Sequence, residues 1–309
     1  MHIVIAGGTG FIGRTVAIWL TTGGHRVTVL TRNPERYRSR LPDAIALTAW
    51  DGEDPQTVQS ILDGVQVVIN LCGESIAAQR WTATRKQVLL RNRLVPTRCL
   101  VEAMGHLSES GVCPGTFISA SGVGYYGPTD DVVDEHAPPG RGFLADLCRR
   151  WEDEAVRAET YGIRTIRLRI GMVLGRDGGA LPQMLLPFRL FLGGPLGSGK
   201  QFVSWIHQDD LARLMEWIGE TPAVRGPVNA VAPHPVTMQE FSALLGQVLN
   251  RPSWLRIPEA LLKLGLGELA TVMTTGQRVR PTVALDHGFR FEYPDLLSAL
   301  RSLLADSGS

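Results

Sequence analysis

The stretch MHIVIAGGTGFIG, residues 1–13, decides the fold of this chain. Residues 2–6 form a short apolar run, which is typical of a strand buried on both faces. Glycines then follow at the spacing G-x-x-G-x-x-G, and apolar residues recur at helical spacing over residues 12–20. The glycine pair at 23–24 ends that helix, and residues 27–31 form a second apolar run. The stretch therefore predicts a strand–helix–strand unit.

The glycine spacing favours a bound dinucleotide. Gly7 allows a tight turn, Gly10 lets the backbone approach a pyrophosphate, and Gly13 lets the helix lie close to the strand. The unpaired N–H groups at the start of the helix and the helix dipole both favour an anion. We expect the cofactor to contact Gly7, Thr9, Gly10, Phe11, Ile12 and Gly13. A glycine-rich turn without a ligand is the alternative.

The end of the second strand indicates which dinucleotide binds. An NAD site needs a carboxylate there for the ribose 2′-hydroxyl, whereas an NADP site favours arginine. The chain has Thr31 and Arg32 at this point and no carboxylate before Glu35. Arg32 can bind a 2′-phosphate with two hydrogen bonds and Thr31 can donate its hydroxyl. This pattern predicts NADP(H), with a solvated loop cation as the alternative role of Arg32.

Composition excludes several other classes of protein. The 309 residues are 44% hydrophobic and carry a formal charge of +1, so they give no reason to expect a nucleic-acid or acidic-membrane partner. No apolar run approaches the ~20 residues of a membrane span. The four cysteines show no disulfide or metal-binding spacing. Because Met1 leads directly into the first strand, we expect a cytoplasmic protein without a targeting segment.

Further apolar runs extend the pattern into an α/β fold with a doubly wound parallel sheet, the Rossmann type. Strands are expected at 44–51, 65–71, 116–121, 164–174 and 226–231, and helices at 55–63, 82–104 and 143–160. Ligands bind beyond the carboxyl ends of such strands, so residues 72–75 are expected to border the cofactor. The acidic residues at 130–135 are expected to be a solvated loop, and no metal site is predicted.

Glycines and prolines after residue 174 mark the start of a smaller carboxyl-terminal substrate lobe. We expect residues 1–174 to form the NADP-binding domain, with 203–232 returning to it. Residues 175–202 and 233–309 would form the lobe. Residues 194–200 match the start of a triphosphate-binding loop, but Gln201 follows where a hydroxyl for magnesium is needed, so this match carries no function.

Several motifs together resemble the extended branch of the short-chain dehydrogenase/reductase superfamily, and most closely its epimerase-like atypical subfamily of the YfcH type. They are GGTGFIG at 7–13, NLCGE at 70–74, GVGYYG at 122–127, RWE at 150–152, LPFRLFLGGPLGSGKQFVSWIHQDDLA at 186–212 and GQRVRP at 276–281. The resemblance implies a doubly wound sheet, NADP(H) binding and a carboxyl-terminal domain of unknown function. It also implies that Thr31, Arg32, Leu71, Cys72, Gly73, Arg93 and Val173 contact the cofactor.

The chain departs from the superfamily at the catalytic helix. Active members use Tyr-x-x-x-Lys, in which the lysine lowers the pKa of the tyrosine so that it exchanges a proton at neutral pH. Placing Glu152 on the usual acidic residue of that helix puts Leu144 at the tyrosine position and Cys148 at the lysine position. Because Leu144 cannot exchange a proton, the usual reductase chemistry is not supported by this helix.

Other side chains can replace the missing pair. Ser121 can donate a hydrogen bond to a substrate oxygen, and Tyr125 or Tyr126 can reach the nicotinamide, although the tyrosines can equally be packing residues. Glu74 can act as a base if it is buried, and His207 is expected to orient the turn into the next helix. The pocket of an acidic or phosphorylated substrate can be lined by Arg80, Trp81, Arg278 and Arg280, and a solvated or inter-lobe role is the alternative for the three arginines.

Two hypotheses remain from the sequence. The chain is either an NADP-dependent oxidoreductase or nucleotide-sugar epimerase without the usual dyad, or a non-catalytic NADPH-binding protein with a regulatory or redox-sensing role. Cofactor and fold agree with both. The missing dyad favours the second hypothesis, and the polar residues at the carboxyl ends of the strands favour the first. The sequence identifies no substrate, and it leaves a homodimer open.

Overall fold

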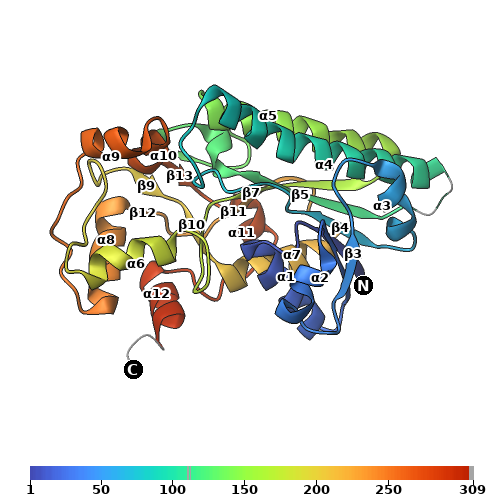
Figure 1. Ribbon diagram of the computed structural model, residues 1–309, viewed down its shortest axis with the longest axis horizontal. Coiled ribbons are helices and arrows are strands. Elements are labelled where there is room, and N and C mark those ends of the chain that lie inside the picture. Colours follow the sequence, from blue (N-terminus) through green and yellow to red (C-terminus); the bar gives the residue numbers. More distant parts are fainter. Residues whose placement is uncertain (110, 112, 306–309) are drawn as a thin grey trace.

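The computed structural model describes residues 1–109, 111 and 113–305 (Figure 1). Its main feature is a seven-stranded parallel sheet. The strands lie in the order β11 (Gly226–Ala230), β7 (Arg164–Ile170), β5 (Thr116–Gly122), β4 (Val67–Asn70), β1 (His2–Ala6), β2 (Arg26–Thr31) and β3 (Ala46–Ala49). The chain runs outward from β1 to β3 and then returns to β4 on the other side of β1, so the order reverses between β1 and β4.

Helices cover both faces of this sheet. The helices α1 (Phe11–Thr22) and α7 (Gln208–Glu220) lie against one face, and α3 (Pro55–Leu62), α4 (Ala83–Glu109) and α5 (Phe143–Val156) lie against the other (Figure 1). Alternate residues of β1 enter the two cores, Ile3 and Ile5 on the α1–α7 side and Val4 and Ala6 on the α3–α4 side. The expected doubly wound parallel sheet is confirmed.

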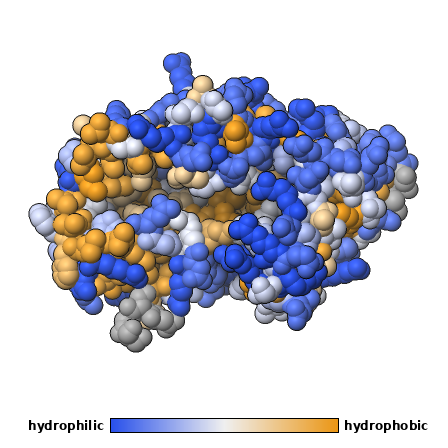
Figure 2. Space-filling view, in the orientation of Figure 1, coloured by the Kyte–Doolittle hydropathy of each residue, from blue (hydrophilic) through white to orange (hydrophobic). Residues whose placement is uncertain are grey.

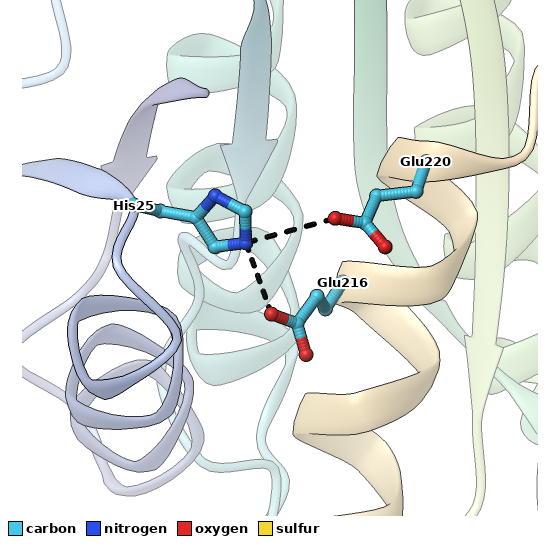
Figure 3. Close-up of side chains that lie close together, drawn as sticks. All are labelled: His25, Glu216 and Glu220. Carbon is cyan, nitrogen blue, oxygen red and sulfur yellow. Dashed lines mark hydrogen bonds and ion pairs between the residues drawn. The ribbon is translucent and has the colours of Figure 1, made fainter.

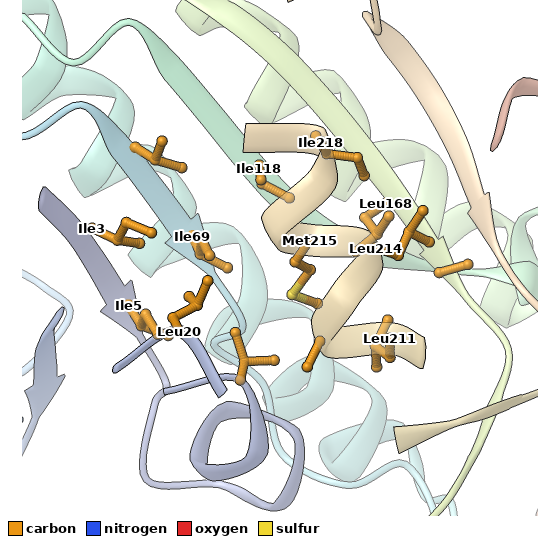
Figure 4. Packing of buried hydrophobic residues seen from close by; sticks show 14 of the residues in the cluster. Ile3, Ile5, Leu20, Ile69, Ile118, Leu168, Leu211, Leu214, Met215 and Ile218 are labelled. Atoms are coloured by element: carbon orange, nitrogen blue, oxygen red, sulfur yellow. The ribbon is translucent and has the colours of Figure 1, made fainter. Parts of the chain in front are cut away.

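Helix α7 is held by apolar burial and by one arginine. Figure 4 shows its side chains packed over the strands, with Met215 and Ile218 fully buried. Burying each such side chain is worth about 1.5–3 kcal/mol. At the end of α7, the buried Arg164 of β7 donates hydrogen bonds to the carbonyls of Ile218 and Val224, at 3.0 and 2.9 Å. A charged residue in an apolar strand thus binds carbonyls at the end of α7 and in the turn that follows the helix.

A polar clamp joins α7 to the turn after α1 (Figure 3). His25 Nε2 donates to Glu216 Oε1 at 2.9 Å, Trp19 Nε1 donates to Glu216 Oε2 at 2.7 Å, and Glu220 Oε1 lies 3.9 Å from His25 Nε2. These are the residue types of a metal site, with ligand atoms within 4.8 Å of one another. The hydrogen bonds to Glu216 already account for the arrangement, so we interpret it as a structural contact.

The smaller lobe lies beside the carboxyl edge of the sheet (Figure 1). Its own apolar core contains Trp205, Phe241 and Leu300, each fully buried. The helices of this region are α6 (Leu181–Arg189), α8 (Met238–Leu249), α9 (Glu259–Leu266), α10 (Leu269–Thr274) and α12 (Leu296–Leu304), whereas α11 (Thr282–Asp286) packs against β11 of the main sheet. Its short strands are β8 (Met172–Leu174), β9 (Phe202–Val203), β10 (Trp205–His207), β12 (Val236–Thr237) and β13 (Gln277–Val279).

The remaining elements are β6 (Thr129–Val133), α2 (Pro34–Tyr37) and three short 3-10 helices, Arg38–Arg40, Val123–Tyr126 and Arg157–Tyr161. Within the part of the chain that the structure describes, no helix is long and apolar enough to cross a membrane. Cys72, Cys99, Cys113 and Cys148 are free. The domain boundaries stay a prediction, although β11 does lie in the main sheet.

Two sequence expectations about local structure are wrong. The strand expected at 164–174 is interrupted at Gly171, between β7 and β8. The backbone of Ser204 approaches Gly171 so closely that a Cβ there would lie 2.5 Å from the Ser204 carbonyl oxygen. The chain turns at this point, and β8 pairs with β10 outside the main sheet. The expected solvated acidic loop instead contains β6, which pairs with β13. Its last acid, Glu135, is buried, and Glu135 Oε1 accepts the backbone N–H of Asn229 at 2.9 Å.

Candidate functional site

The three motif glycines form a cradle between β1 and α1. Gly7 has a φ of 77°, and a Cβ there would lie 2.7 Å from the backbone of Leu71. At Gly13, a Cβ would lie 2.4 Å from the carbonyl oxygen of Gly7. Gly10 differs, because its only close neighbour would be that same oxygen at 3.4 Å, so space lies above it. The cradle is closed beneath two of its glycines and open at the third.

Helix α1 begins at this opening, and no side chain of the described residues caps its first N–H groups. Gly10 is its N-cap and provides no side-chain hydrogen bond, and the first turn contains no acidic residue. The first N–H groups of a helix have no partner within the helix, and they attract anions. The half-buried Thr9 and Ile12 flank the same opening. The arrangement can bind a pyrophosphate through backbone groups alone.

Phe11 joins the cradle to the start of the smaller lobe. A Cβ on Gly175, Gly178 or Gly179 would lie 2.4 to 2.9 Å from the Phe11 ring, so the loop needs glycine at all three positions. A Cβ on Gly179 would also lie 2.8 Å from the carbonyl oxygen of Val173, in β8. The structure therefore brings Val173, a predicted cofactor contact, near the cradle.

The loop after β4 forms the next side of the site. The fully buried Asn70 donates to Thr97 Oγ1 at 2.8 Å and accepts the Cys72 backbone N–H at 3.1 Å, which fixes the direction of the loop. A Cβ on Gly73 would lie 3.1 Å from the guanidinium of Arg93, and Arg93 donates to the carbonyl of Glu74 at 2.7 Å. Burial lowers the pKa of Arg93.

Arg32 lies at the carboxyl end of β2, exposed, and makes no hydrogen bond or ion pair with the described residues. Burial raises the pKa of the Cys72 thiol to about 12, and the positive charge of Arg32 opposes this increase. Because β2 and β4 both lie parallel to β1, Arg32 and the loop after β4 are at the same edge of the sheet. Thr31, buried beside it, accepts the backbone N–H of Asn33 at 3.4 Å.

The predicted cofactor residues thus share one edge of the sheet. The carboxyl ends of β1, β2 and β4 lie side by side, and they carry or precede most of these residues. Arg93 reaches this edge from α4 and Val173 from β8. This edge spans the point where the strand order reverses, which is where open α/β sheets bind their ligands.

At the ends of β5 and β7, the polar side chains bond to one another. Glu152 accepts two hydrogen bonds from Arg169, both 2.9 Å, and one from Ser121 at 2.7 Å. Arg169 also donates to the Tyr126 hydroxyl at 2.9 Å, and that hydroxyl donates to Asn229 Oδ1 at 2.7 Å. All five residues are buried. We call them the paired network.

The three hydroxyl groups predicted to be catalytic therefore differ. Those of Ser121 and Tyr126 are in the paired network, and burial raises the pKa of Tyr126 to about 12. The Tyr125 ring lies over the Arg169 guanidinium, 3.5 Å from ring centroid to Cζ. Tyr125 is half-buried, and its hydroxyl makes no hydrogen bond to the described residues. Only this hydroxyl is available to a ligand without breaking a bond.

The two positions expected for the dyad hold residues that are unsuited to proton exchange. Leu144 lies against Gly124, where a Cβ would be 3.0 Å from the leucine Cβ. Cys148 is buried under Gly122, and burial raises the pKa of its thiol to about 11. Neither side chain can donate and recover a proton near neutral pH.

The remaining sequence candidates have varied surroundings. Glu74 is half-exposed and pairs with Arg85 at 2.6 Å, so it is not the buried base that was considered. His207 is the N-cap of α7 and accepts the Asp209 backbone N–H at 3.1 Å, which confirms its expected role in orienting that helix. Trp81 packs edge-on against Phe143. Exposed side chains are found at Arg80, Arg278 and Arg280.

Sequence reasoning missed the importance of Arg169 and Asn229. Each is a polar residue inside a buried strand, a signal that the sequence contains. It also missed Asn70, which locks the loop after β4. The partners of these residues lie far away in the chain, so the sequence alone does not show which bonds they make.

Comparisons with known proteins find related sequences along nearly the whole chain. Residues 3–230 match the model of the NAD dependent epimerase/dehydratase family, and residues 257–303 match a domain of unknown function, DUF1731. The "Epimerase family protein SDR39U1 homolog, chloroplastic" of Arabidopsis thaliana is 39% identical over 98% of this chain and 87% of its own length. The expected relationship is confirmed, whereas the cytoplasmic location is not established by relatives that include a chloroplast protein.

Solved structures extend the agreement to the whole fold. The human epimerase family protein SDR39U1 (isoform 2), crystallised with NADPH, has a TM-score of 0.86 and 32% identity, and covers 99% of this chain and 100% of its own. A UDP-glucose 4-epimerase of Thermotoga maritima with UDP-glucose has a TM-score of 0.80 at 19% identity, covering 99% of this chain and 98% of its own, and shares the fold. The chain belongs to the NAD dependent epimerase/dehydratase family.

Proposed function

We propose that this chain binds NADP(H) along the carboxyl edge of β1, β2 and β4 and acts as an NADP-dependent oxidoreductase of the epimerase-like type. The observation that carries the cofactor assignment is Arg32, which has no partner among the described residues and lies at the same edge of the sheet as the cradle that opens at Gly10. The human relative crystallised with NADPH supports the same choice. The absence of a carboxylate at the end of β2 favours the phosphorylated cofactor.

The residues present fit this cofactor. Backbone N–H groups at the start of α1 would hold the pyrophosphate, and Arg32 with Thr31 would hold the 2′-phosphate. The loop at 71–73 would lie along the adenosine ribose, and Val173 would lie near the nicotinamide. When bound, NADPH supplies a hydride for the reduction of a carbonyl carbon.

Tyr125 is the residue best placed to provide the accompanying proton. Its hydroxyl is unbonded within the described chain, and the half-exposed side chain can recover a proton from solvent. Arg169, held by Glu152, fixes the ring from below. A general acid in this position contributes roughly 10²–10⁴-fold to the rate.

A second candidate function is NADPH binding without catalysis, with a regulatory or redox-sensing role. It is favoured by the bonded hydroxyls of Ser121 and Tyr126 and by the buried thiol of Cys148. Oxidation of NADPH by carbonyl compounds or nucleotide sugars, followed in wild type and in Tyr125→Phe, decides between them. Turnover that falls 10²-fold or more in the variant, at unchanged NADPH affinity, supports the enzyme. A bound cofactor that raises Tm without any turnover supports the second candidate.

The cofactor assignment has its own test. In Arg32→Ala, NADPH binding is expected to weaken by 10- to 100-fold, because a charge-assisted contact is worth about 1.5–3 kcal/mol, while NADH binding stays the same. Arg225→Ala is the matched control, since this exposed arginine precedes β11, the outermost strand on the side of the sheet away from β2. Equal losses for both cofactors would contradict the assignment of the 2′-phosphate to Arg32.

A further inference from the structure

We propose that the substrate is a carbonyl compound with a long apolar part, and that helix α9 and the aromatic pair Trp81–Phe143 hold this part. The inference rests on the proposed function, which places the reacting carbonyl at the carboxyl edge of the sheet. It assigns a role to α9, within the matched domain of unknown function.

Helix α9 is rich in leucine, and two of its four leucines are exposed. It carries leucines at 261, 262, 264 and 266, yet none of its residues is buried. Leu261 is 60% exposed and Leu264 is 77% exposed. Most helices in proteins are stabilised by packing an apolar face, and this helix has no such contact on its outer side. Its leucines are therefore available to an apolar partner.

Contacts hold the end of α9 over the aromatic pair. Lys86 Nζ lies 2.7 Å from both carboxylate oxygens of Glu268, which lies two residues after α9. The same ammonium lies 5.1 Å from the centroid of the Phe143 ring, which is 5.0 Å from the Trp81 ring. Arg80 lies beside Gly267, where a Cβ would be 3.3 Å from its Nη2. The end of α9 therefore lies close to Arg80 and Lys86, next to the aromatic pair.

The aromatic pair continues into the proposed reaction site. Trp81, Phe143 and Tyr125 border one apolar cluster, together with Leu71 and Ile170 at the carboxyl ends of their strands. Figure 2 shows a hollow between the two parts of the molecule, with an apolar floor that continues onto the smaller lobe. An apolar chain with its carbonyl near Tyr125 can lie along this surface to α9, and the Lys86 and Glu268 charges between the aromatic pair and the helix are paired with each other.

Charges nearby favour the same occupant over a nucleotide sugar. A diphosphate needs unpaired cations, but Glu74 pairs with Arg85 and Glu268 pairs with Lys86 at this wall. The exposed Arg80 and Arg256 are two cations near α9 that form no ion pair with the described residues. A nucleotide sugar is therefore the competing ligand, and a second copy of the chain or a lipid surface would be the competing partner for the leucines.

The test measures binding of straight-chain alcohols to the full chain loaded with NADP⁺. By titration calorimetry, affinity is expected to rise about fourfold per methylene from 1-butanol to 1-decanol, since each buried methylene is worth about 0.8 kcal/mol. UDP-glucose is expected to bind more weakly than 1-decanol. Leu264→Ser should flatten the dependence on chain length, and Ile18→Ser should not, because the 41% exposed Ile18 lies on α1.

Other results would overturn the inference. These are affinity independent of chain length, UDP-glucose binding more tightly than 1-decanol, or a Leu264→Ser variant that alters only dimerisation or binding to phosphatidylcholine vesicles. NADPH affinity is measured separately in each variant without alcohol. A wild-type chain that fails to bind NADPH contradicts the proposed function. The alcohol series without cofactor then still measures binding to α9 and the Trp81–Phe143 pair.

Discussion

Two regions at the same edge of the sheet use polar groups in opposite ways. The first region is the cradle of Gly7, Gly10 and Gly13 with Arg32 beside it. Within the described chain, neither the Arg32 guanidinium nor the N-terminus of α1 has a side-chain partner. The paired network bonds its polar atoms to each other in a buried region. Unpaired groups at an open surface indicate a ligand, whereas paired groups in the interior indicate architecture. Residue type alone does not distinguish the two.

The largest expected effect concerns the paired network. Glu152→Gln leaves the buried Arg169 without its carboxylate and should lower the free energy of unfolding by about 3–5 kcal/mol, measured with urea. NADPH affinity of the folded variant should not change. In the control Asp153→Asn, a 64% exposed carboxylate loses its bond to Arg149, and the loss should stay below about 1 kcal/mol.

If Glu152→Gln kept its stability but lost NADPH binding, the comparison would fail, because the network would then belong to the cofactor site. If both variants lost similar stability, burial would not be what makes the network important. The contrast between the two regions is supported only if Glu152→Gln is less stable than Asp153→Asn and both variants still bind NADPH.

Sequence reasoning recovered the fold because its signals are local. The apolar runs, the glycine spacing and the helical periodicity each lie within a few residues, and they predicted the main sheet and its helices. The break at Gly171 depends instead on the approach of Ser204, which no local pattern reveals. The burial of Glu135 likewise depends on the backbone N–H of Asn229, 94 residues along the chain.

The candidate site divides in the same way. Gly10 and Arg32 are recognised from motifs whose geometry is local. The surroundings of Ser121 and Tyr126 depend on Glu152 and Asn229, which are 31 and 103 residues away. A hydroxyl in the sequence is a possible proton donor in every case. Whether it is free depends on tertiary contacts, and among the three predicted hydroxyls only that of Tyr125 is free within the described residues.

The cradle offers a smaller effect that separates ligand binding from folding. Gly10 has φ −72°, and a Cβ there meets nothing closer than 3.4 Å, so Gly10→Ala should fold normally. The added methyl would occupy the approach of the pyrophosphate and should weaken NADPH binding about a hundredfold, or about 2.7 kcal/mol. Fluorescence titration with NADPH and urea unfolding of the same sample measure both quantities.

Gly13→Ala is the matched variant, because its Cβ would lie 2.4 Å from a backbone oxygen. It should lose stability as well as binding. Should Gly10→Ala bind NADPH like the wild type, the opening above Gly10 would not be where the pyrophosphate lies. The distinction between an open cradle and a closed interior would then lose its functional meaning.

The smallest effect concerns the His207 imidazole, at the junction with the smaller lobe. It tests whether burial and hydrogen bonding keep this ring neutral. His207 is buried, stacks on Tyr293 at 4.0 Å, lies 3.1 Å from Ser302 Oγ and accepts the Asp209 N–H. Burial lowers its pKa from 6.5 to about 4, although the nearby carboxylates of Asp210 and Glu292 oppose this shift.

Between pH 6.5 and 4, the unfolded chain therefore binds a proton at His207 that the folded chain does not. The contribution of His207 to stability is nearly complete above pH 6.5 and should fall by about 2.5 kcal/mol as the pH drops to 4. His207→Asn keeps a helix-capping acceptor but cannot titrate. The difference in unfolding free energy between wild type and this variant should shrink across that range, and parallel curves would mean that His207 does not titrate as a buried neutral cap.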